Sequence, residues 1–285
     1  MKKMNCFIYV VLIFTFFCSC HQNKNKALPA ASSRYDFENP ILIKLPDGLA
    51  EISGVAFYPK DSSVFAIVDE DGLLFKIGLN KGNKIEKWRF DKKRDFEDIV
   101  LHDSIFYVLV SNGDIENIQF GNSDSILTTL SAFPYASKKT NEFESLYYDD
   151  TLKQMVLLCK NCEDDDSKIV SAWGYDIGTK NYTQSIYNIV VKPIAQKLSE
   201  VKLKLRPSAT AINPITDELY ILSSINHIIL ITDRQGKYKA LYKLDPATYK
   251  QAEGIAFTPW GDMIVSNESK ETGSSNILII KNKQK

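Results

Sequence analysis

The chain has 285 residues, with 35 basic and 35 acidic side chains, so its formal net charge is zero. Basic side chains do not cluster with aromatic ones, so nothing in the charge pattern supports a nucleic-acid partner. Roughly 250 residues follow the N-terminal segment, and this length suits one large domain with a substantial core.

The first twenty residues have the features of an export signal. Lys2 and Lys3 precede an apolar run, Phe7 to Phe17, of eleven residues. This run fits a signal-peptide core and is shorter than the roughly 20 residues of a membrane-spanning helix. Ser19 stands just before Cys20, where a lipoprotein signal peptidase would cut. We therefore predict a signal peptide over residues 1–19 and a lipidated Cys20, with ordinary secretion or an uncleaved anchor as alternatives.

Residues 20–38 are small or polar and show no periodicity, as expected of a flexible tether. One lipidated cysteine anchors a protein to a membrane without spanning it. The tether carries no acidic cluster, which favours the periplasmic face of the outer membrane in a bacterial cell envelope. The expected partners are the membrane, through Cys20, and an unknown envelope ligand or protein, with the chain itself a monomer.

A short strand-like phrase recurs five times in the rest of the chain. It reads E-I-S-G-V-A-F from Glu51, F-E-D-I-V around Glu97, F-E-S-L-Y-Y around Glu144, P-S-A-T-A-I around Ser208 and A-E-G-I-A-F around Glu253. The spacing is in the mid-forties, except for a step of 64 residues from Glu144 to Ser208. A period of this size, built from short strands, is typical of a propeller or array.

Each phrase is followed by β-branched and apolar runs bounded by Asp, Asn, Gly, Ser and Pro turns. Most units contain four such strands, which is the blade of a β-propeller. The last unit lacks a fourth strand, and an unassigned strand, Pro40 to Pro46, precedes the first unit. We therefore predict an all-β fold over residues 39–285: a five-bladed β-propeller of four-stranded antiparallel blades, closed by the N-terminal strand.

The 64-residue step contains the one helix-like stretch, Pro193 to Lys202. We interpret this step as a blade with insertions and not as a missing sixth blade. Cys159 and Cys162 also fall in it, and their C-x-x-C spacing leaves two possibilities open. They are either a buried thiol with a loop thiol, or a local disulfide, which an oxidising compartment permits. A zinc ribbon would need a second pair.

The repeated glutamates are the main candidates for chemistry. The first strand of each propeller blade lines the central channel, so Glu51, Glu97, Glu144 and Glu253 are expected at one mouth. Carboxylates at close range must raise their pKa values, recruit basic partners or bind a cation. Ligands that are all oxygen favour a hard ion such as Ca²⁺ over zinc.

A second set of side-chain oxygens follows the second strand of each unit. Its members are Asp69, Glu70, Asn112, Asn161, Asn226, Asn267 and Glu268. In an antiparallel pair these positions lie at the same rim as the glutamates, although Asp and Asn at strand ends are also common turn formers. Nucleophilic catalysis has little support, because His21, His102 and His227 form no recognisable catalytic motif.

From about Pro40 onward, the five phrases and their order resemble the SdiA-regulated family of bacterial envelope proteins. The resemblance implies a five-bladed propeller, distantly similar to NHL-repeat proteins, and no established biochemical activity. It also implies a calcium site formed by Glu51, Glu97, Glu144 and Glu253, with Glu268 as an outer ligand. The fourth unit departs from the family pattern, because Arg206 precedes P-S-A where an acidic residue is usual. Arg206 would then neutralise part of the ring.

Two functions follow from this interpretation. The favoured one is a membrane-anchored module that binds calcium in or near its central channel and uses that mouth to bind a ligand or partner. The alternative is a calcium-dependent hydrolase of lactones, phosphoesters or phytate, in which Ca²⁺ polarises a carbonyl or phosphoryl oxygen. No histidine is placed to act as its general base.

Overall fold

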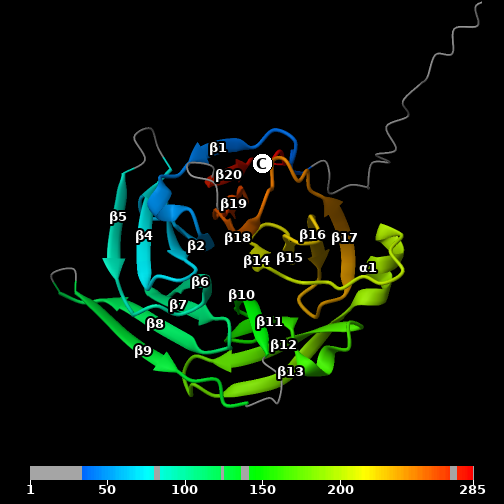
Figure 1. Ribbon diagram of the computed structural model, residues 1–285, viewed down its shortest axis with the longest axis horizontal. Helices are drawn as coiled ribbons and strands as arrows, with labels where there is room; N and C mark the ends of the chain where they lie inside the picture. The colour runs from blue at the N-terminus through cyan, green and yellow to red at the C-terminus, as the bar shows by residue number, and fades with distance from the viewer. Residues whose placement is uncertain (1–33, 80–83, 123–124, 136–140, 270–274, 285) are drawn as a thin grey trace, which may run out of the picture.

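The computed structural model describes residues 34–79, 84–122, 125–135, 141–269 and 275–284. The predicted signal peptide, Cys20 and most of the tether lie outside these residues. Five four-stranded antiparallel sheets are arranged around one central axis, which Figure 1 views end-on. The predicted five-bladed β-propeller is therefore confirmed.

Within each blade the strands follow one another from the centre outward, except where the chain closes the ring. Blade 1 consists of β2 (Ile52–Tyr58), β3 (Ser63–Val68), β4 (Leu73–Gly78) and β5 (Ile85–Arg89). Blade 2 consists of β6 (Phe96–His102), β7 (Ile105–Val110), β8 (Ile115–Phe120) and β9 (Ile126–Ser131). Blade 3 consists of β10 (Glu142–Asp149), β11 (Gln154–Asn161), β12 (Ile169–Asp176) and β13 (Tyr182–Val190). Blade 4 consists of β14 (Ala209–Asn213), β15 (Glu218–Ser223), β16 (Ile228–Thr232) and β17 (Tyr238–Lys243).

Blade 5 joins the two ends of the described chain. It consists of β18 (Ala252–Phe257), β19 (Met263–Asn267), β20 (Asn276–Ile280) and, as its outer strand, β1 (Ile41–Lys44). The antiparallel register of β1 and β20 runs from Ile41 opposite Ile279 to Lys44 opposite Asn276. The predicted closure by the N-terminal strand is therefore confirmed, and it pairs a sheet edge that would otherwise be open.

The fold extends N-terminal to β1. Tyr35 is 3% exposed, and its hydroxyl donates to the Gly261 carbonyl over 2.7 Å and accepts from Asn213 Nδ2 over 2.7 Å. Tyr35 thus joins the chain ahead of β1 to blades 4 and 5. Packed contacts begin before residue 39, the predicted start of the propeller.

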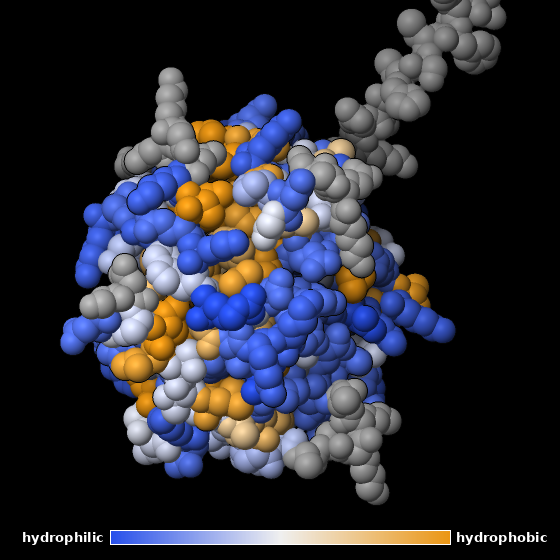
Figure 2. All heavy atoms as spheres, turned by 60° about the vertical axis from the view of Figure 1, so that its left-hand side comes forward, coloured by the Kyte–Doolittle hydropathy of each residue, from blue (hydrophilic) through white to orange (hydrophobic). Residues whose placement is uncertain are grey.

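The hydrophobic core is divided into five clusters, one at each interface between neighbouring blades. Between blades 1 and 2, for example, the rings of Phe65 and Phe106 lie 4.5 Å apart. The exposed aliphatic side chains lie mainly on outer strands, with Ile41 and Leu42 on β1 and Leu127 and Leu130 on β9. Figure 2 brings the left-hand side of Figure 1 forward and shows that the apolar side chains on this face form patches separated by hydrophilic ones.

The long step in the repeat is an insertion in the crossing from blade 3 to blade 4, as predicted. Helix α1 (Val191–Leu198) follows β13 directly and buries Val191, Ile194 and Leu198 in the cluster between these blades. Two short 3-10 turns, η2 (Asp47–Leu49) and η4 (Glu163–Asp165), complete the described elements. None of the described helices is long and apolar enough to cross a membrane.

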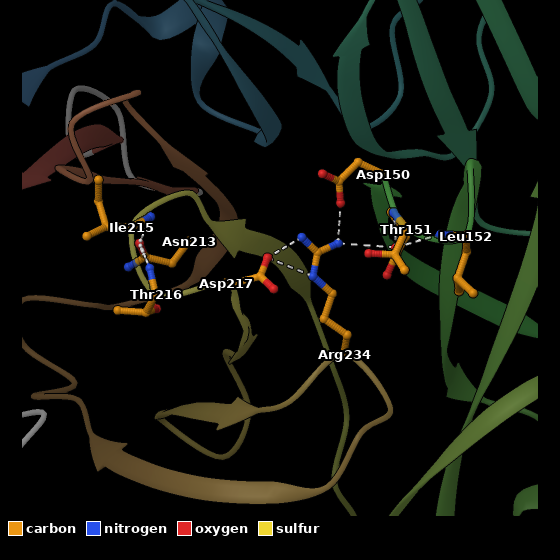
Figure 3. A network of polar contacts seen from close by, with 9 residues as sticks. Asp150, Thr151, Leu152, Asn213, Ile215, Thr216, Asp217 and Arg234 are labelled. Carbon is orange, nitrogen blue, oxygen red and sulfur yellow. Dashed lines mark hydrogen bonds and ion pairs between the residues drawn. The ribbon is translucent and has the colours of Figure 1, made fainter.

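Arg234 links blades 3 and 4 at the rim where the first strands end (Figure 3). Its guanidinium lies 3.1 Å from Asp149 Oδ1 and 2.6 Å from Asp150 Oδ1, and it also pairs with Asp217. Asp149 is fully buried and accepts the backbone N–H groups of Thr151 and Leu152. Arg234 is therefore the positive partner of a buried carboxylate.

We expect Arg234→Ala to destabilise the fold by about 3–5 kcal/mol, because it leaves the Asp149 carboxylate buried without a cation. Urea denaturation followed by circular dichroism measures this change. Asp217→Asn is the matched control: the Asp217 side chain is 73% exposed, so its loss is expected to cost less than about 1 kcal/mol. Equal effects of the two substitutions would contradict the assigned role of Arg234.

Candidate functional site

Three of the predicted glutamates occupy equivalent positions on the first strands of their blades. Glu97, Glu144 and Glu253 each lie at a shift in register, a β-bulge, between the first and second strands. A bulge inserts one unpaired residue and redirects its side chain. The shared bulge explains why the same residue type recurs in the sequence phrase.

The register places Glu51 differently. In blade 1 the shift falls between Ile52 and Val55, so Ser53 takes the bulge position. The Glu51 carbonyl accepts the N–H of Asp69 over 3.1 Å, as the Asp95 carbonyl accepts the N–H of Ser111 over 2.9 Å. Glu51 is therefore equivalent to Asp95, and the sequence alignment of Glu51 with Glu97 was wrong by two residues.

The channel mouth thus has two tiers of residues, with one residue from each blade in each tier. The inner tier is Ser53, Glu97, Glu144 and Glu253 at the bulges, with Ser208, just before β14, at the equivalent position of blade 4. The outer tier, two residues earlier, is Glu51, Asp95, Glu142, Arg206 and Gln251. The acidic residue at Asp95 was missed by the sequence analysis, because the phrases were aligned without the bulge.

Below the inner tier the channel is apolar. The residues two positions further along the first strands are all buried: Val55, Ile99, Leu146, Thr210 and Ile255. Together with five half-buried residues at the opposite end, they line a cavity of about 240 Å³. Those five are Phe57, Leu101, Tyr148, Ile212 and Phe257. The carboxylates therefore stand above a floor of low polarity.

This setting disfavours charge on the carboxylates. Burial raises the pKa of Glu97 to about 9, and the negative charges of Asp95 and Asp69 add to the rise. Burial likewise raises the pKa of Asp69 to about 7, with Asp95, Glu268 and Glu51 contributing. Asp69 Oδ1 is also buried without a hydrogen-bond partner.

Glu253 belongs to the same group of charges. Burial raises its pKa to about 7, the charge of Glu268 adds to the rise, and hydrogen bonds with Gln251 and Ser224 oppose it. Gln251 Nε2 also donates to Glu268 Oε2 over 2.6 Å. The outer candidate Glu268 is therefore close to the predicted ring, and it touches the group from the second strand of blade 5.

The positive charge in the mouth comes from Lys160 at the end of β11. Its ammonium pairs with Glu144 and lies 3.3 Å from Glu142 Oε1. Its positive charge also opposes part of the rise in the pKa values of Glu97 and Glu253, so Lys160 acts on blades 2 and 5 as well as on its own blade. The sequence suggested Arg206 for this role, but no ion pair of Arg206 is found within the described ranges.

Lys160 is held between two bonded cysteines. Cys159 and Cys162 form a disulfide with their Cα atoms 5.9 Å apart, which decides between the two possibilities left open above. Cys159 is fully buried, and η4 follows Cys162 directly. The disulfide thus fixes a short loop that contains the counter-charge of Glu144.

The cluster of carboxylates at the mouth suits a cation by the type of its ligand atoms more than by the distances between them. It offers only oxygen ligands, an unpartnered buried oxygen on Asp69, and many more acidic than basic groups. Within the described ranges, however, the one set of three His, Cys, Asp or Glu ligand atoms within 4.8 Å is Cys159, Cys162 and Asp165, which includes the disulfide. Side-chain rotation or bridging water is therefore needed for three mouth carboxylates to share one ion.

The remaining candidates from the second strands are mostly structural. Asn112 Oδ1 accepts the N–H of Asp114, and Asn226 Oδ1 accepts the N–H of Arg206. Asn267 donates to the carbonyl of Thr248 and to Asn276 Oδ1, and exposed Glu70 lies 3.6 Å from Lys93. Of this set, Asp69 and Glu268 belong to the cluster of carboxylates at the mouth. Asn161 lies opposite Glu142 in the pairing of β11 with β10.

The two described histidines differ in position. His102 ends β6 at the opposite end of the channel and stacks on Tyr148 with ring centroids 3.6 Å apart. His227 lies in the turn between β15 and β16, next to Asn226, which bonds the outer-tier residue Arg206, so it lies at the end of the channel that carries the mouth.

The raised pKa values predict a falling stability with rising pH in metal-free protein. Folded Glu97 keeps a proton up to about pH 9, whereas the unfolded chain loses it near the ordinary value of 4.5. The folded state therefore binds more protons over this range, and its unfolding free energy decreases as the pH rises through it. Asp69 and Glu253 add to the decrease up to about pH 7.

Thermal unfolding in excess chelator at a series of pH values measures this slope. We expect the midpoint to fall from about pH 5 to pH 9, and Glu97→Gln to flatten the dependence. Asp164→Asn, in the exposed acidic turn, should keep the slope of the unaltered protein. A midpoint that stays level or rises over this range would refute the assignment.

Comparison with known proteins places this fold in a wider group. Among curated proteins, no sequence relative was found. Glutaminyl cyclase from Myxococcus xanthus is 13% identical, with a TM-score of 0.56 over 85% of this chain and 95% of that chain. Luciferin-regenerating enzyme is 12% identical, with a TM-score of 0.52 over 86% of this chain and 96% of that chain.

Regucalcin from Agrobacterium tumefaciens, described as a calcium-binding protein, is 12% identical with a TM-score of 0.51, over 88% of this chain and 95% of that chain. At such identities the likeness shows the fold alone. A family model is more specific, because the SdiA-regulated model matches residues 34–270, which include both tiers of the mouth. The chain belongs to the SdiA-regulated family.

Proposed function

We propose that this protein is a lipid-anchored envelope propeller that binds calcium at its acidic mouth and uses that mouth to hold a ligand or partner. The observation that carries the proposal is the set of half-buried side chains of Asp69, Glu97 and Glu253, in which Asp69 Oδ1 has no hydrogen-bond partner and all three pKa values are raised. Carboxyl groups kept this close over an apolar floor are costly to ionise, and a divalent cation removes that cost.

The residues that would hold the ion are those facing the centre of the mouth. Asp69, Glu97 and Glu253 are the central ones, and Glu51, Asp95 and Glu268 surround them. Glu144 contributes less, because the Lys160 ammonium already neutralises it. Bound calcium would supply a positive charge that attracts an anionic or polar group of a ligand.

A uniform ring of carboxylates would bind the ion equally from every side. Here blade 4 supplies Ser208 and Arg206, and blade 3 supplies Lys160, so acidic and basic halves face each other. A ligand with a negative group is favoured on the basic side and through the ion. This asymmetry supports a binding module with an oriented ligand.

The alternative, a calcium-dependent hydrolase, has one observation in its favour. Carboxyl groups with a pKa of about 7, such as Glu253 and Asp69, can exchange protons near neutral pH as a general acid or base. Lactone, phosphoester and phytate substrates, assayed with calcium and with chelator, test this. Calcium-dependent turnover that is lost in Glu253→Gln would replace the binding module by an enzyme.

Isothermal titration with calcium tests the metal site directly. We expect Glu97→Gln and Asp69→Asn each to weaken calcium binding by about tenfold or more, since each removes a charged oxygen ligand. Asp164→Asn, outside the mouth, is the control and should bind as the unaltered protein does. Calcium binding that is undetectable, or unchanged in both mouth variants, would disprove the site.

A substitution that removes positive charge from the mouth tests the same calcium site in the opposite direction. Lys160→Met removes the cation that competes for Glu144, so we expect calcium to bind more tightly. Without calcium the same variant should be less stable, because it leaves Glu144 buried and unpaired. Calcium should then restore most of the lost stability, which thermal unfolding in both conditions measures.

The anchor is tested by membrane fractionation. Cys20→Ala removes the predicted lipidation site, so we expect the protein to move from the membrane fraction to the soluble periplasmic fraction. Ser19→Ala, which keeps a small residue before Cys20, is the control. Membrane association that persists in Cys20→Ala would favour an uncleaved anchor.

A further inference from the structure

A second concave site lies beside the mouth, between blades 3 and 4. It is a pocket of about 180 Å³, formed by the end of β11, the turn around η4 and the segment that leads into β14. Its lining mixes apolar side chains with charged ones of both signs, which include Lys160, Asp165, Lys204 and Arg206. Its volume is below the roughly 300 Å³ at which drug-sized ligand pockets begin, so it suits a small molecule.

Two of these cations have no acidic partner within the described ranges. Lys160 is paired with Glu144, and Asp166 at the pocket edge lies 3.7 Å from Lys168. No ion pair is found for Lys204 or Arg206, although acidic side chains line the same pocket. Unpaired cations in a concave site favour an anionic ligand.

Arg206 is held in place by its backbone. Its N–H donates to Asn226 Oδ1 over 3.3 Å, and its carbonyl accepts from Ser223 Oγ over 2.6 Å. Buried Pro207 follows and restricts the chain further. The guanidinium therefore starts from a fixed point at the pocket wall, which lowers the entropy lost when a ligand binds.

Asp165 lies in the wall on the other side of the pocket. It is 8% exposed, and its Oδ2 accepts the N–H of Ser171 over 3.0 Å. Its Oδ1 is enclosed by the protein and has no hydrogen-bond partner. The hydrogen bond of this carboxyl group is therefore directed to the backbone and not to the two cations.

We infer that this pocket binds a small organic acid, whose negative group Arg206 and Lys204 meet. The site goes beyond the proposed calcium function: it shares Lys160 and the outer-tier residue Arg206 with the mouth, but Lys204, Asp165 and the turn around η4 belong to the pocket alone. It also explains why the fourth unit has a basic residue where its neighbours in the outer tier are acidic or neutral.

Three probes cover the main forms of such an acid: glucuronate, glutamate and glycerol 3-phosphate. Isothermal titration in chelator should show saturable binding of at least one of them, tighter than about 10 mM. Glucuronate methyl ester, which lacks the negative charge, should bind more weakly than glucuronate. Absence of binding by all three acids, or equal binding of glucuronate and its methyl ester, would overturn the inference.

Variants locate the site. Arg206→Gln should weaken binding of the best acid by about tenfold, because it removes a charge-assisted hydrogen bond. Lys202→Gln is the matched control, since this exposed lysine lies in the same segment but does not line the pocket. Unaltered thermal unfolding of Arg206→Gln would show that the fold is kept, and equal affinity in the two variants would place binding elsewhere.

Calcium separates this inference from the proposed function. Acid binding in chelator that is weakened by Lys204→Gln as well as by Arg206→Gln supports the pocket even if no calcium site is found. Calcium binding that is lost in Glu97→Gln supports the mouth even if no acid binds. Acid binding that requires calcium and is unchanged in Lys204→Gln would assign the acid to the mouth and reject the pocket.

Discussion

The whole structure depends on closing a ring of five sheets. Each blade buries its two faces only because a neighbour stands on each side, and the five core clusters fall at these five contacts. Pairing of β1 with β20 completes the last blade from the two ends of the described chain. Closure also sets the chemistry of the mouth, since it brings the five first strands to one axis.

The charge of the mouth follows from what lies beneath it. The buried residues Val55, Ile99, Leu146 and Ile255 replace water below the carboxyl groups, so ionisation there lacks solvation from one side. Negative charge is tolerated where Lys160 reaches it and is suppressed at Glu97, where burial and the neighbouring carboxylates outweigh that cation. Keeping a proton relieves this unfavourable negative charge, and the proposed calcium ion would relieve the same charge by pairing with it.

Much of this could be predicted from the sequence, because repeats and strand patterns depend on local residue choice. The blades, the closing strand and the insertion before blade 4 were all predicted. The misplaced residue was Glu51, because a β-bulge changes the register without a sequence signal of its own. Asp95 and Lys160 were missed for a related reason: their roles arise from contacts across blades, and a lysine after a strand looks like any surface lysine.

The point where the chain enters the ring has a mechanical consequence. A pull on the chain ahead of Arg34 is met by the hydrogen bond of the Arg34 carbonyl with the Lys283 N–H and by Tyr35, which is hydrogen-bonded to blades 4 and 5, before it reaches β1. The load is thus shared by two blades before it reaches the strand that holds the ring closed. Tension applied at this end of the domain therefore falls on side chains packed in the core before it falls on the outer edge of blade 5.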